Sequence, residues 1–208
     1  MPLRYPSDVV VETYKIIGDL DYGQLTAEQY RNIFRAPAEQ VVAELGVRTQ
    51  DRLIEAEGGP LRLRFYFPEG TGPFPILLYC HGGGFMNGSP ESTDSICAAL
   101  AREASCIVIS PDYRLAPETP FPGGLEDCWT ALTWAHDHAS SFGGDETRLA
   151  VCGDSSGGNF AAVLALMAAS TRLKLCLQVM LYVRRQIIWL RFGRGLVERR
   201  PCPGFDVM

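Results

Sequence analysis

The sequence has 208 residues, of which 47% are hydrophobic, 21% charged and 10% aromatic. These values are typical of one folded domain and exclude a disordered, collagen-like or low-complexity chain. No apolar run is long enough to cross a bilayer, and residues 1–7 lack the apolar core of a secretory signal. We therefore expect a cytoplasmic protein.

The net charge of −5 is unevenly distributed along the chain. Residues 1–170 carry a net charge of −11, whereas residues 171–208 carry +6. Such an end segment can be a basic tail with its own partner, or a segment foreign to the fold before it. The seven cysteines include no C-x-x-C pair, so they predict neither a zinc site nor a disulfide framework.

Residues 1–50 predict two short helices. Apolar positions between Val9 and Ile17 mark the first, and the capping box that begins at Thr26 starts the second. Residues 61–67 then alternate between apolar and polar, which is the period of a half-exposed strand. Two glycines and a proline at 58–60 turn into it from an earlier strand at 52–57, so we expect a hairpin.

From residue 74 onward, short apolar runs alternate with helical patterns. We predict strands at 74–80, 106–110, 149–152 and 175–182, and helices at 96–103, 125–138 and 159–169. Uninterrupted apolar strands separated by helices require a parallel sheet that is covered on both faces. The predicted class is α/β.

The segment 153–158, Gly-Asp-Ser-Ser-Gly-Gly, contains G-x-S-x-G centred on Ser155 and lies between a predicted strand and a predicted helix. A nucleophile elbow needs this context and small neighbours that permit its strained turn. The N-terminus of the following helix also directs positive partial charge at the serine oxygen. A Gly/Ser-rich turn without a catalytic role is the alternative.

A second motif, His-Gly-Gly-Gly-Phe at 81–85, follows the predicted strand 74–80. Successive glycines expose backbone N–H groups without side-chain obstruction, which is what an oxyanion hole requires. A flexible loop explains neither the histidine nor the position after a buried strand. Together the two motifs indicate a serine hydrolase.

These motifs resemble those of the hormone-sensitive-lipase-like (GDXG) esterases and lipases. Residues 81–85 match the HGGGF motif, and residues 153–158 match GDSAGG with Ser156 in place of alanine. Residues 112–122 match DYRLAPE followed by FP. The resemblance implies an α/β-hydrolase fold with a mostly parallel sheet, an N-terminal helical cap at 1–50 and a partial core at 51–182.

The resemblance also implies roles for individual residues. Ser155 is the implied nucleophile on an ester carbonyl, and the N–H groups of Gly82, Gly83 and Ser156 are the implied oxyanion donors. The residues implied to support the two motifs are His81, Gly84, Asp154, Gly153 and Gly157. The resemblance implies no metal or organic cofactor, a small ester with a short acyl chain as substrate, and no nucleic-acid partner.

A base for the serine is missing from the expected place. The fold's order is Ser, then Asp or Glu, then His, but the histidines at 81, 136 and 138 all precede Ser155. After Tyr182 the family pattern stops, and residues 183–208 are too few for the further strand–helix units. We interpret them as a divergent basic tail left by truncation or a frame change, because loss of the motifs, reversal of charge and shortened length coincide there. A basic membrane-binding helix is the weaker alternative, because the apolar residues form no amphipathic face.

These observations predict an esterase whose activity is impaired. A non-catalytic ligand-binding or interaction protein that reuses the fold is the alternative. A second alternative is an esterase whose site is completed by another chain that supplies the Asp and the His. We also expect self-association through an exposed sheet edge, where further strands would pair.

Overall fold

The computed structural model describes residues 24–33, 46–171, 173–181 and 187–190. Its contacts divide the chain into two units, Met1–Phe34 and Arg35–Met208. In the first, α2 (Ala27–Ile33) begins with the predicted capping box: the Thr26 N–H donates to Gln29 Oε1 (2.9 Å), and the Gln29 N–H donates to Thr26 Oγ1 (3.2 Å). The helix predicted at 9–17 lies outside the described residues.

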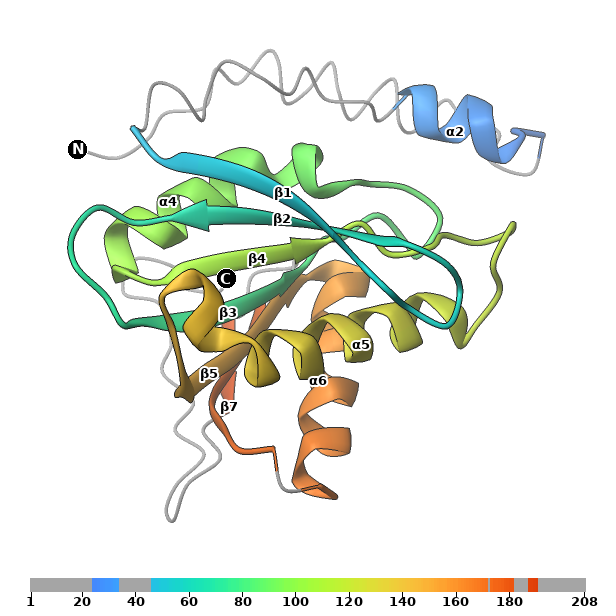
Figure 1. Cartoon of the computed structure of the whole chain (residues 1–208). Helices are drawn as coiled ribbons and strands as arrows, with labels where there is room; N and C mark the ends of the chain where they lie inside the picture. The colour runs from blue at the N-terminus through green and yellow to red at the C-terminus, as the bar shows by residue number, and fades with distance from the viewer. Residues whose placement is uncertain (1–23, 34–45, 172, 182–186, 191–208) are drawn as a thin grey trace, which may run out of the picture. The chain divides into compact units, whose positions relative to one another are not determined.

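The second unit is built on a sheet of seven strands in the order β1-β2-β4-β3-β5-β6-β7 (Figure 1). The strands are β1 (Arg48–Ile54), β2 (Leu61–Phe67), β3 (Phe74–Cys80), β4 (Ile107–Pro111), β5 (Gly144–Asp154), β6 (Leu175–Leu181) and β7 (Ile187–Leu190). The pairs β3–β4, β3–β5 and β5–β6 are parallel, whereas β1–β2, β2–β4 and β6–β7 are antiparallel. The predicted hairpin and parallel centre are confirmed.

Helices cover both faces of this sheet. They are α4 (Asp94–Ala104), α5 (Gly123–Asp137) and α6 (Ser155–Ala169), with short 3₁₀ turns η1 (Pro90–Thr93) and η2 (Ala139–Phe142). In Figure 1, α4 lies on one face of the sheet and α5 and α6 lie on the other. None of the helices in the described part of the chain is long and apolar enough to span a membrane.

Alternation along each strand creates two cores of different size. In β3, Ile76 and Leu78 point into a large core beneath α5 and α6, whereas Tyr79 points into a smaller one beneath α4. We call these the α5/α6 core and the α4 core. The α5/α6 core includes Phe65 and Leu164, whose side chains are completely buried.

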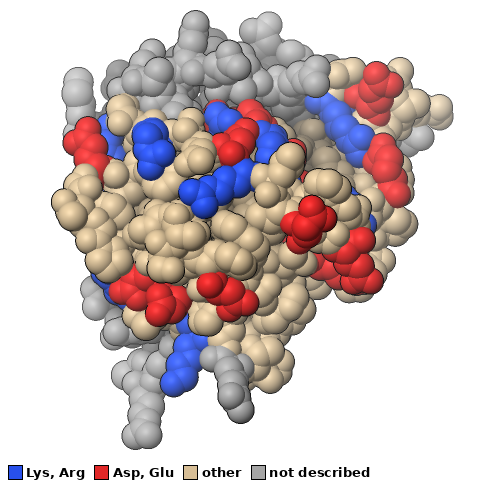
Figure 2. All heavy atoms as spheres, viewed as in Figure 1, with Lys and Arg blue, Asp and Glu red and all other residues tan. Residues whose placement is uncertain are grey.

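The alternation predicted for β2 is present at Arg62 and Arg64, which stay partly exposed, but it is wrong at Tyr66, where η1 and α4 cover the second face. Tyr66 is buried, and its hydroxyl donates to Asp94 Oδ1 (2.6 Å). Arg64 pairs with the same carboxylate (2.9 Å), and Arg62 pairs with Asp112 (2.9 Å). Figure 2 shows such basic and acidic groups side by side over the upper part of one face, where β1 lies in Figure 1.

The sheet also takes in part of the predicted basic tail. Strand β7 comprises residues 187–190 and pairs antiparallel with β6, with Leu181 opposite Ile187 and Gln178 opposite Leu190. These four residues therefore belong to the sheet rather than to a separate tail. Tyr182, the predicted last residue of β6, and the other tail residues lie outside the described part.

Candidate active site

The segment around Ser155 forms a sharp turn between β5, which ends at Asp154, and α6, which begins at Ser155. Ser155 has φ of 50°, in the left-handed region that L-residues seldom adopt, and its side chain is exposed. A Cβ added to Gly157 would overlap the carbonyl oxygens of Cys80 and His81, so only glycine permits this approach to β3. The predicted elbow geometry is present.

The glycine loop after β3 lies directly beside this turn, because Cys80 and Gly153 are partners in the β3–β5 register. Gly83 adopts φ of 127°, and a Cβ there would overlap the backbone of Asn87. The Met86 and Asn87 N–H groups both donate to the Gly83 carbonyl (3.2 and 3.0 Å), which closes the loop. Its backbone is therefore held in one conformation.

Asp154 joins the elbow to the glycine loop. Its Oδ1 accepts hydrogen bonds from the Gly82 N–H (2.8 Å) and from the Tyr79 hydroxyl (2.9 Å). Burial, together with this neighbouring carboxylate, raises the pKa of Tyr79, so its hydroxyl stays protonated and donates. The expected donor role of Gly82 does not fit this structure, because its N–H already has an acceptor.

Backbone N–H groups of the glycine loop and of the first turn of α6 remain available. Within the described part of the chain, the N–H groups of Gly83 and Gly84 have no acceptor. Ser156 lies in the first turn of α6, where the backbone N–H has no acceptor within the helix. Gly84, which the resemblance placed only in a supporting role, therefore has the free N–H group that Gly82 lacks.

His81 is packed inside the glycine loop and is completely buried. Its ring stacks on Tyr113 (centroids 4.1 Å apart), and its Nδ1 lies 2.8 Å from the Gly82 carbonyl, so Nδ1 carries the proton. The Tyr113 hydroxyl in turn donates to the His81 carbonyl (2.7 Å). Burial lowers the pKa of His81, which favours the neutral ring.

The other two histidines lie at the end of the sheet where β5 begins, opposite to the end that carries Ser155. His136 Nδ1 is 2.8 Å from Asp137 Oδ1, and the His138 ring stacks on Trp134 at the end of α5. Strand β5 follows, and its eleven residues separate this end of the sheet from Ser155 by roughly 30 Å. None of the three histidines in the sequence therefore stands beside the Ser155 hydroxyl as a base.

The loop after β4 completes one side of the site. Arg114 binds the buried Asp127 of α5 through Nε (2.8 Å) and Nη2 (2.9 Å), and its backbone N–H donates to the same carboxylate (2.9 Å). The Ala116 N–H donates to the Phe85 carbonyl (2.9 Å), which ties this loop to the glycine loop. Sequence analysis did not single out Asp127, whose position in an amphipathic helix gave no signal.

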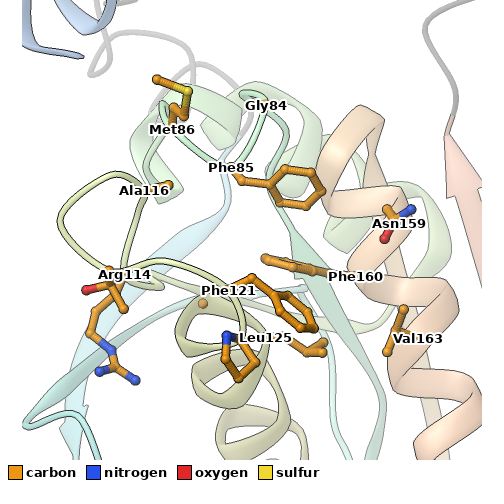
Figure 3. Close-up of a pocket in the computed structure, with 13 residues that line it drawn as sticks. Gly84, Phe85, Met86, Arg114, Ala116, Phe121, Leu125, Asn159, Phe160 and Val163 are labelled. Atoms are coloured by element: carbon orange, nitrogen blue, oxygen red, sulfur yellow. The ribbon is translucent and has the colours of Figure 1, made fainter. Parts of the chain in front are cut away.

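An apolar pocket of about 340 Å³ opens between the glycine loop and α6 (Figure 3). Its wall includes Gly84, Phe85, Phe121, Leu125, Phe160 and Val163. No motif predicted this pocket, because its lining comes from segments far apart in the sequence. Among the described residues, no group of three His, Cys, Asp or Glu side chains could hold a metal ion.

Comparison with known proteins places this geometry in a family. The model of a protein family with the α/β-hydrolase fold matches residues 77–192 of the chain. Esterase LipI of Mycobacterium tuberculosis is 44% identical over 136 residues, which cover 64% of this chain and 42% of that protein. A solved esterase structure from Pyrobaculum calidifontis has a TM-score of 0.72 at 36% identity, covering 80% of this chain and 56% of that one. The gibberellin receptor of Oryza sativa subsp. japonica is 39% identical over 113 residues, or 52% of this chain and 32% of the receptor.

The chain therefore belongs to the α/β-hydrolase fold family. Its relatives there include several esterases, and the predicted place within the hormone-sensitive-lipase-like branch is confirmed. The chain spans about two fifths of the length of the curated relatives it matches, such as the 42% of LipI.

Proposed function

We propose that this chain carries the nucleophile half of a carboxylic-ester hydrolase site, with Ser155 as the nucleophile. The observation that carries the proposal is the exposed Ser155 hydroxyl at a left-handed turn, beside free backbone N–H groups. An α/β-hydrolase nucleophile is presented in this way. The esterase names of the curated relatives favour hydrolysis over a purely ligand-binding role.

In the proposed reaction, Ser155 Oγ forms a bond to the ester carbonyl carbon while the hydroxyl proton passes to a solvent water molecule, because no histidine stands beside it. The carbonyl π electrons move onto oxygen, where the N–H groups of Gly83, Gly84 and Ser156 stabilise the negative charge. One such donor contributes about 3 kcal/mol to a typical transition state. The intermediate then expels the alcohol, and water hydrolyses the acyl-serine.

We infer that this chain performs the reaction slowly. A serine hydroxyl is a weak nucleophile until a neighbouring group removes its proton, and the three histidines lie elsewhere. Binding and the oxyanion donors alone leave roughly 10³- to 10⁴-fold acceleration over water in serine hydrolases that lack their triad. Small esters with short apolar acyl chains are the proposed substrates.

The test is hydrolysis of p-nitrophenyl acetate and p-nitrophenyl butyrate by the purified chain, with Ser155→Ala beside it. The matched control is Ser170→Ala, at the far end of α6, where the hydroxyl donates only to the Met167 carbonyl. We expect slow turnover that Ser155→Ala removes and Ser170→Ala retains. Equal rates in all three proteins would contradict the proposal, and rapid turnover would contradict the inferred impairment.

A further inference from the structure

Arg62 of β2 binds two segments that contact the glycine loop. Its Nη1 and Nη2 each donate to one carboxylate oxygen of Glu91, the latter over 3.0 Å. Its Nε and Nη2 also donate to Asp112 Oδ2 (3.1 and 2.9 Å). Glu91 belongs to η1, which follows the glycine loop, and Asp112 follows β4. The planar guanidinium, with donors on two edges, therefore joins both segments to β2.

The segment that contains Glu91 packs against His81 through Gly88. Gly88 adopts φ of 101°, and a Cβ at this position would overlap His81 Nδ1 and the Gly82 carbonyl oxygen. The Gly88 backbone therefore lies directly against the imidazole ring. Because Gly88 precedes Glu91 by only three residues, a shift of η1 displaces the backbone that contacts His81.

The second segment reaches the same histidine through Tyr113. The Asp112 N–H donates to the Arg62 carbonyl (2.9 Å), so both the main chain and the side chain of Arg62 hold Asp112. Tyr113 comes next, and it contacts His81 through its ring (centroids 4.1 Å apart) and through its hydroxyl, which donates to the His81 carbonyl (2.7 Å). Both segments that Arg62 binds therefore contact His81.

His81 transmits this constraint to the proposed oxyanion donors. It is completely buried, and Gly83 and Gly84 follow it by two and three residues. Hydrogen-bond donors stabilise an oxyanion only when they are aimed at its position in advance. A displacement of about 1 Å can lower a rate by about 100-fold. The position of His81 therefore determines how well the two glycine N–H groups are aimed.

We propose that Arg62 is a positioning residue for the oxyanion donors, which it orients through His81 without touching the substrate. This inference rests on the proposed hydrolysis at Ser155. Arg62 belongs to none of the sequence motifs, because its role depends on carboxylates 29 and 50 positions away. Without Arg62, Glu91 and Asp112 lose their shared partner and repel each other.

Arg64 offers a matched control on the same face of β2. The side chains of Arg62 and Arg64 are 27% and 18% exposed, so each substitution removes a partly buried cation. Arg64 binds Asp94 of α4 (2.9 Å), and its Nη1 lies 3.7 Å from Glu91, beyond hydrogen-bond distance. Within the described residues it makes no bond to Asp112, so its removal leaves the link through Tyr113 in place.

The first measurement is hydrolysis of p-nitrophenyl butyrate by Arg62→Gln and Arg64→Gln, at a temperature where circular dichroism shows both variants folded. Misaligned donors weaken binding of the transition state more than binding of the ester. We therefore expect kcat to fall about tenfold in Arg62→Gln, with KM changed by less than about twofold. Arg64→Gln should keep kcat within about twofold. Equal losses of kcat in the two variants, or a rise in KM alone, would overturn the inference.

Arg62→Lys and Arg64→Lys form a second pair that keeps the positive charge. A lysine ammonium is a point charge and cannot reproduce the paired bonds to Glu91 and Asp112. We expect Arg62→Lys to lower kcat about threefold and Arg64→Lys to leave it unchanged. If either glutamine variant fails to fold, the lysine pair provides the same comparison.

The second measurement does not depend on turnover. Amide hydrogen exchange of residues 81–88 is followed by mass spectrometry in the same proteins. The Met86 and Asn87 N–H groups donate to the Gly83 carbonyl, so their exchange reports whether the loop is closed. We expect exchange that is at least about fivefold faster in Arg62→Gln than in Arg64→Gln, with equal exchange of α6 in both.

The two measurements separate this inference from the proposed function. Faster loop exchange in Arg62→Gln, without any hydrolysis that Ser155→Ala removes, would contradict the proposed function and leave the link between Arg62 and the loop standing. Hydrolysis that Ser155→Ala removes, together with an unchanged kcat in Arg62→Gln, would contradict the positioning role and leave the function standing. Loop exchange that is equal in Arg62→Gln and Arg64→Gln would also contradict the positioning role.

Discussion

The two faces of the sheet are stabilised by different kinds of interaction. The α5/α6 core is large and apolar, and contains an aromatic group in which Phe65 contacts Phe67, Trp134 and Phe142. The α4 core is small, and charged and polar groups of β2, η1 and α4 adjoin it. Apolar packing therefore positions most of the pocket, with the buried Arg114–Asp127 pair at its wall, whereas several directed ionic bonds position the segments on either side of the glycine loop.

Arginines of β2 carry these ionic bonds, and one of them, Arg62, reaches both segments. Arg62 binds Glu91 of η1, just after the glycine loop, and also Asp112, next to the Tyr113 that stacks on His81. Both neighbours of the loop are thus tied to the same strand. The four predictions below test whether the two faces differ as this arrangement indicates.

The largest effect is expected in the α5/α6 core. Leu164→Ala removes a completely buried side chain of α6 and should lower the free energy of unfolding by about 3 kcal/mol. Leu166→Ala, on the exposed side of the same helix, should change it by less than about 0.5 kcal/mol. Urea unfolding measures both, and similar losses in the two variants would show that the packing contrast is absent.

The second effect concerns the charged groups on the α4 face. Asp94→Ala leaves Arg64 and the Tyr66 hydroxyl without their shared acceptor, so we expect a loss of about 2 kcal/mol in urea unfolding. Asp94→Asn keeps an oxygen that can accept from Tyr66 and should cost about half as much. Equal losses in the free energy of unfolding for Asp94→Ala and Asp94→Asn would show that the hydrogen bond to Tyr66 does not stabilise this face.

The third effect is a gain in stability at the elbow. Ser155→Gly should be about 1 kcal/mol more stable than Ser155→Ala, because glycine adopts a φ of 50° without the Cβ clash. Thermal and urea unfolding of the two variants provide the comparison. Equal stabilities would mean that Ser155 carries no backbone strain.

The smallest effect is a pH dependence on the α4 face. The Arg62 guanidinium holds the pKa of Glu91 at about 2, below its ordinary value of 4.5. Because this pKa is lowered in the folded state, the stabilisation is complete above pH 4.5 and is lost as the pH falls toward 2. Glu91 is partly exposed, so we expect protonation of Glu91 to lower the free energy of unfolding by less than about 1 kcal/mol.

Unfolding curves between pH 5 and pH 2 check this expectation. Glu91→Gln should reduce the decrease in the free energy of unfolding between pH 5 and pH 2. Glu103→Gln, at an exposed position of α4, should leave that decrease unchanged. A fall of the same steepness in the Glu91 variant would assign the acid sensitivity to other carboxylates.

Local patterns in the sequence predicted most of the fold. The apolar runs of β3 and β6, the capping box at Thr26 and the G-x-S-x-G turn are short-range signals, and each has its counterpart in the structure. The burial of Tyr66 on the second face of β2 was not predicted, because Arg62 and Arg64 look solvated until Asp51 of the hairpin and carboxylates 29 or more positions away are placed beside them. Burial of charged groups depends on such distant partners.

In the candidate site, too, local motifs predicted some features, whereas others depend on residues far apart in the sequence. Gly83 and Ser155 follow from their motifs, but the Gly82 contact with Asp154 joins residues 72 positions apart and could not be predicted. The pocket also depends on distant contacts, since Phe85, Phe121 and Val163 come from three separate segments. Residue types predicted the chemistry, and the sheet register determined which N–H groups remain free.

The hydrogen bonds of Asp154 have a consequence for protein engineering. Because one carboxylate binds both Gly82 and Tyr79 across the β3–β5 pair, the turn at Ser155 and the glycine loop form a single preassembled unit. Such a unit can be transferred to another parallel sheet if the register and these side chains are copied together. A designer who builds a serine-hydrolase triad on such a unit then has two groups to place near Ser155, a histidine base and the carboxylate that orients it.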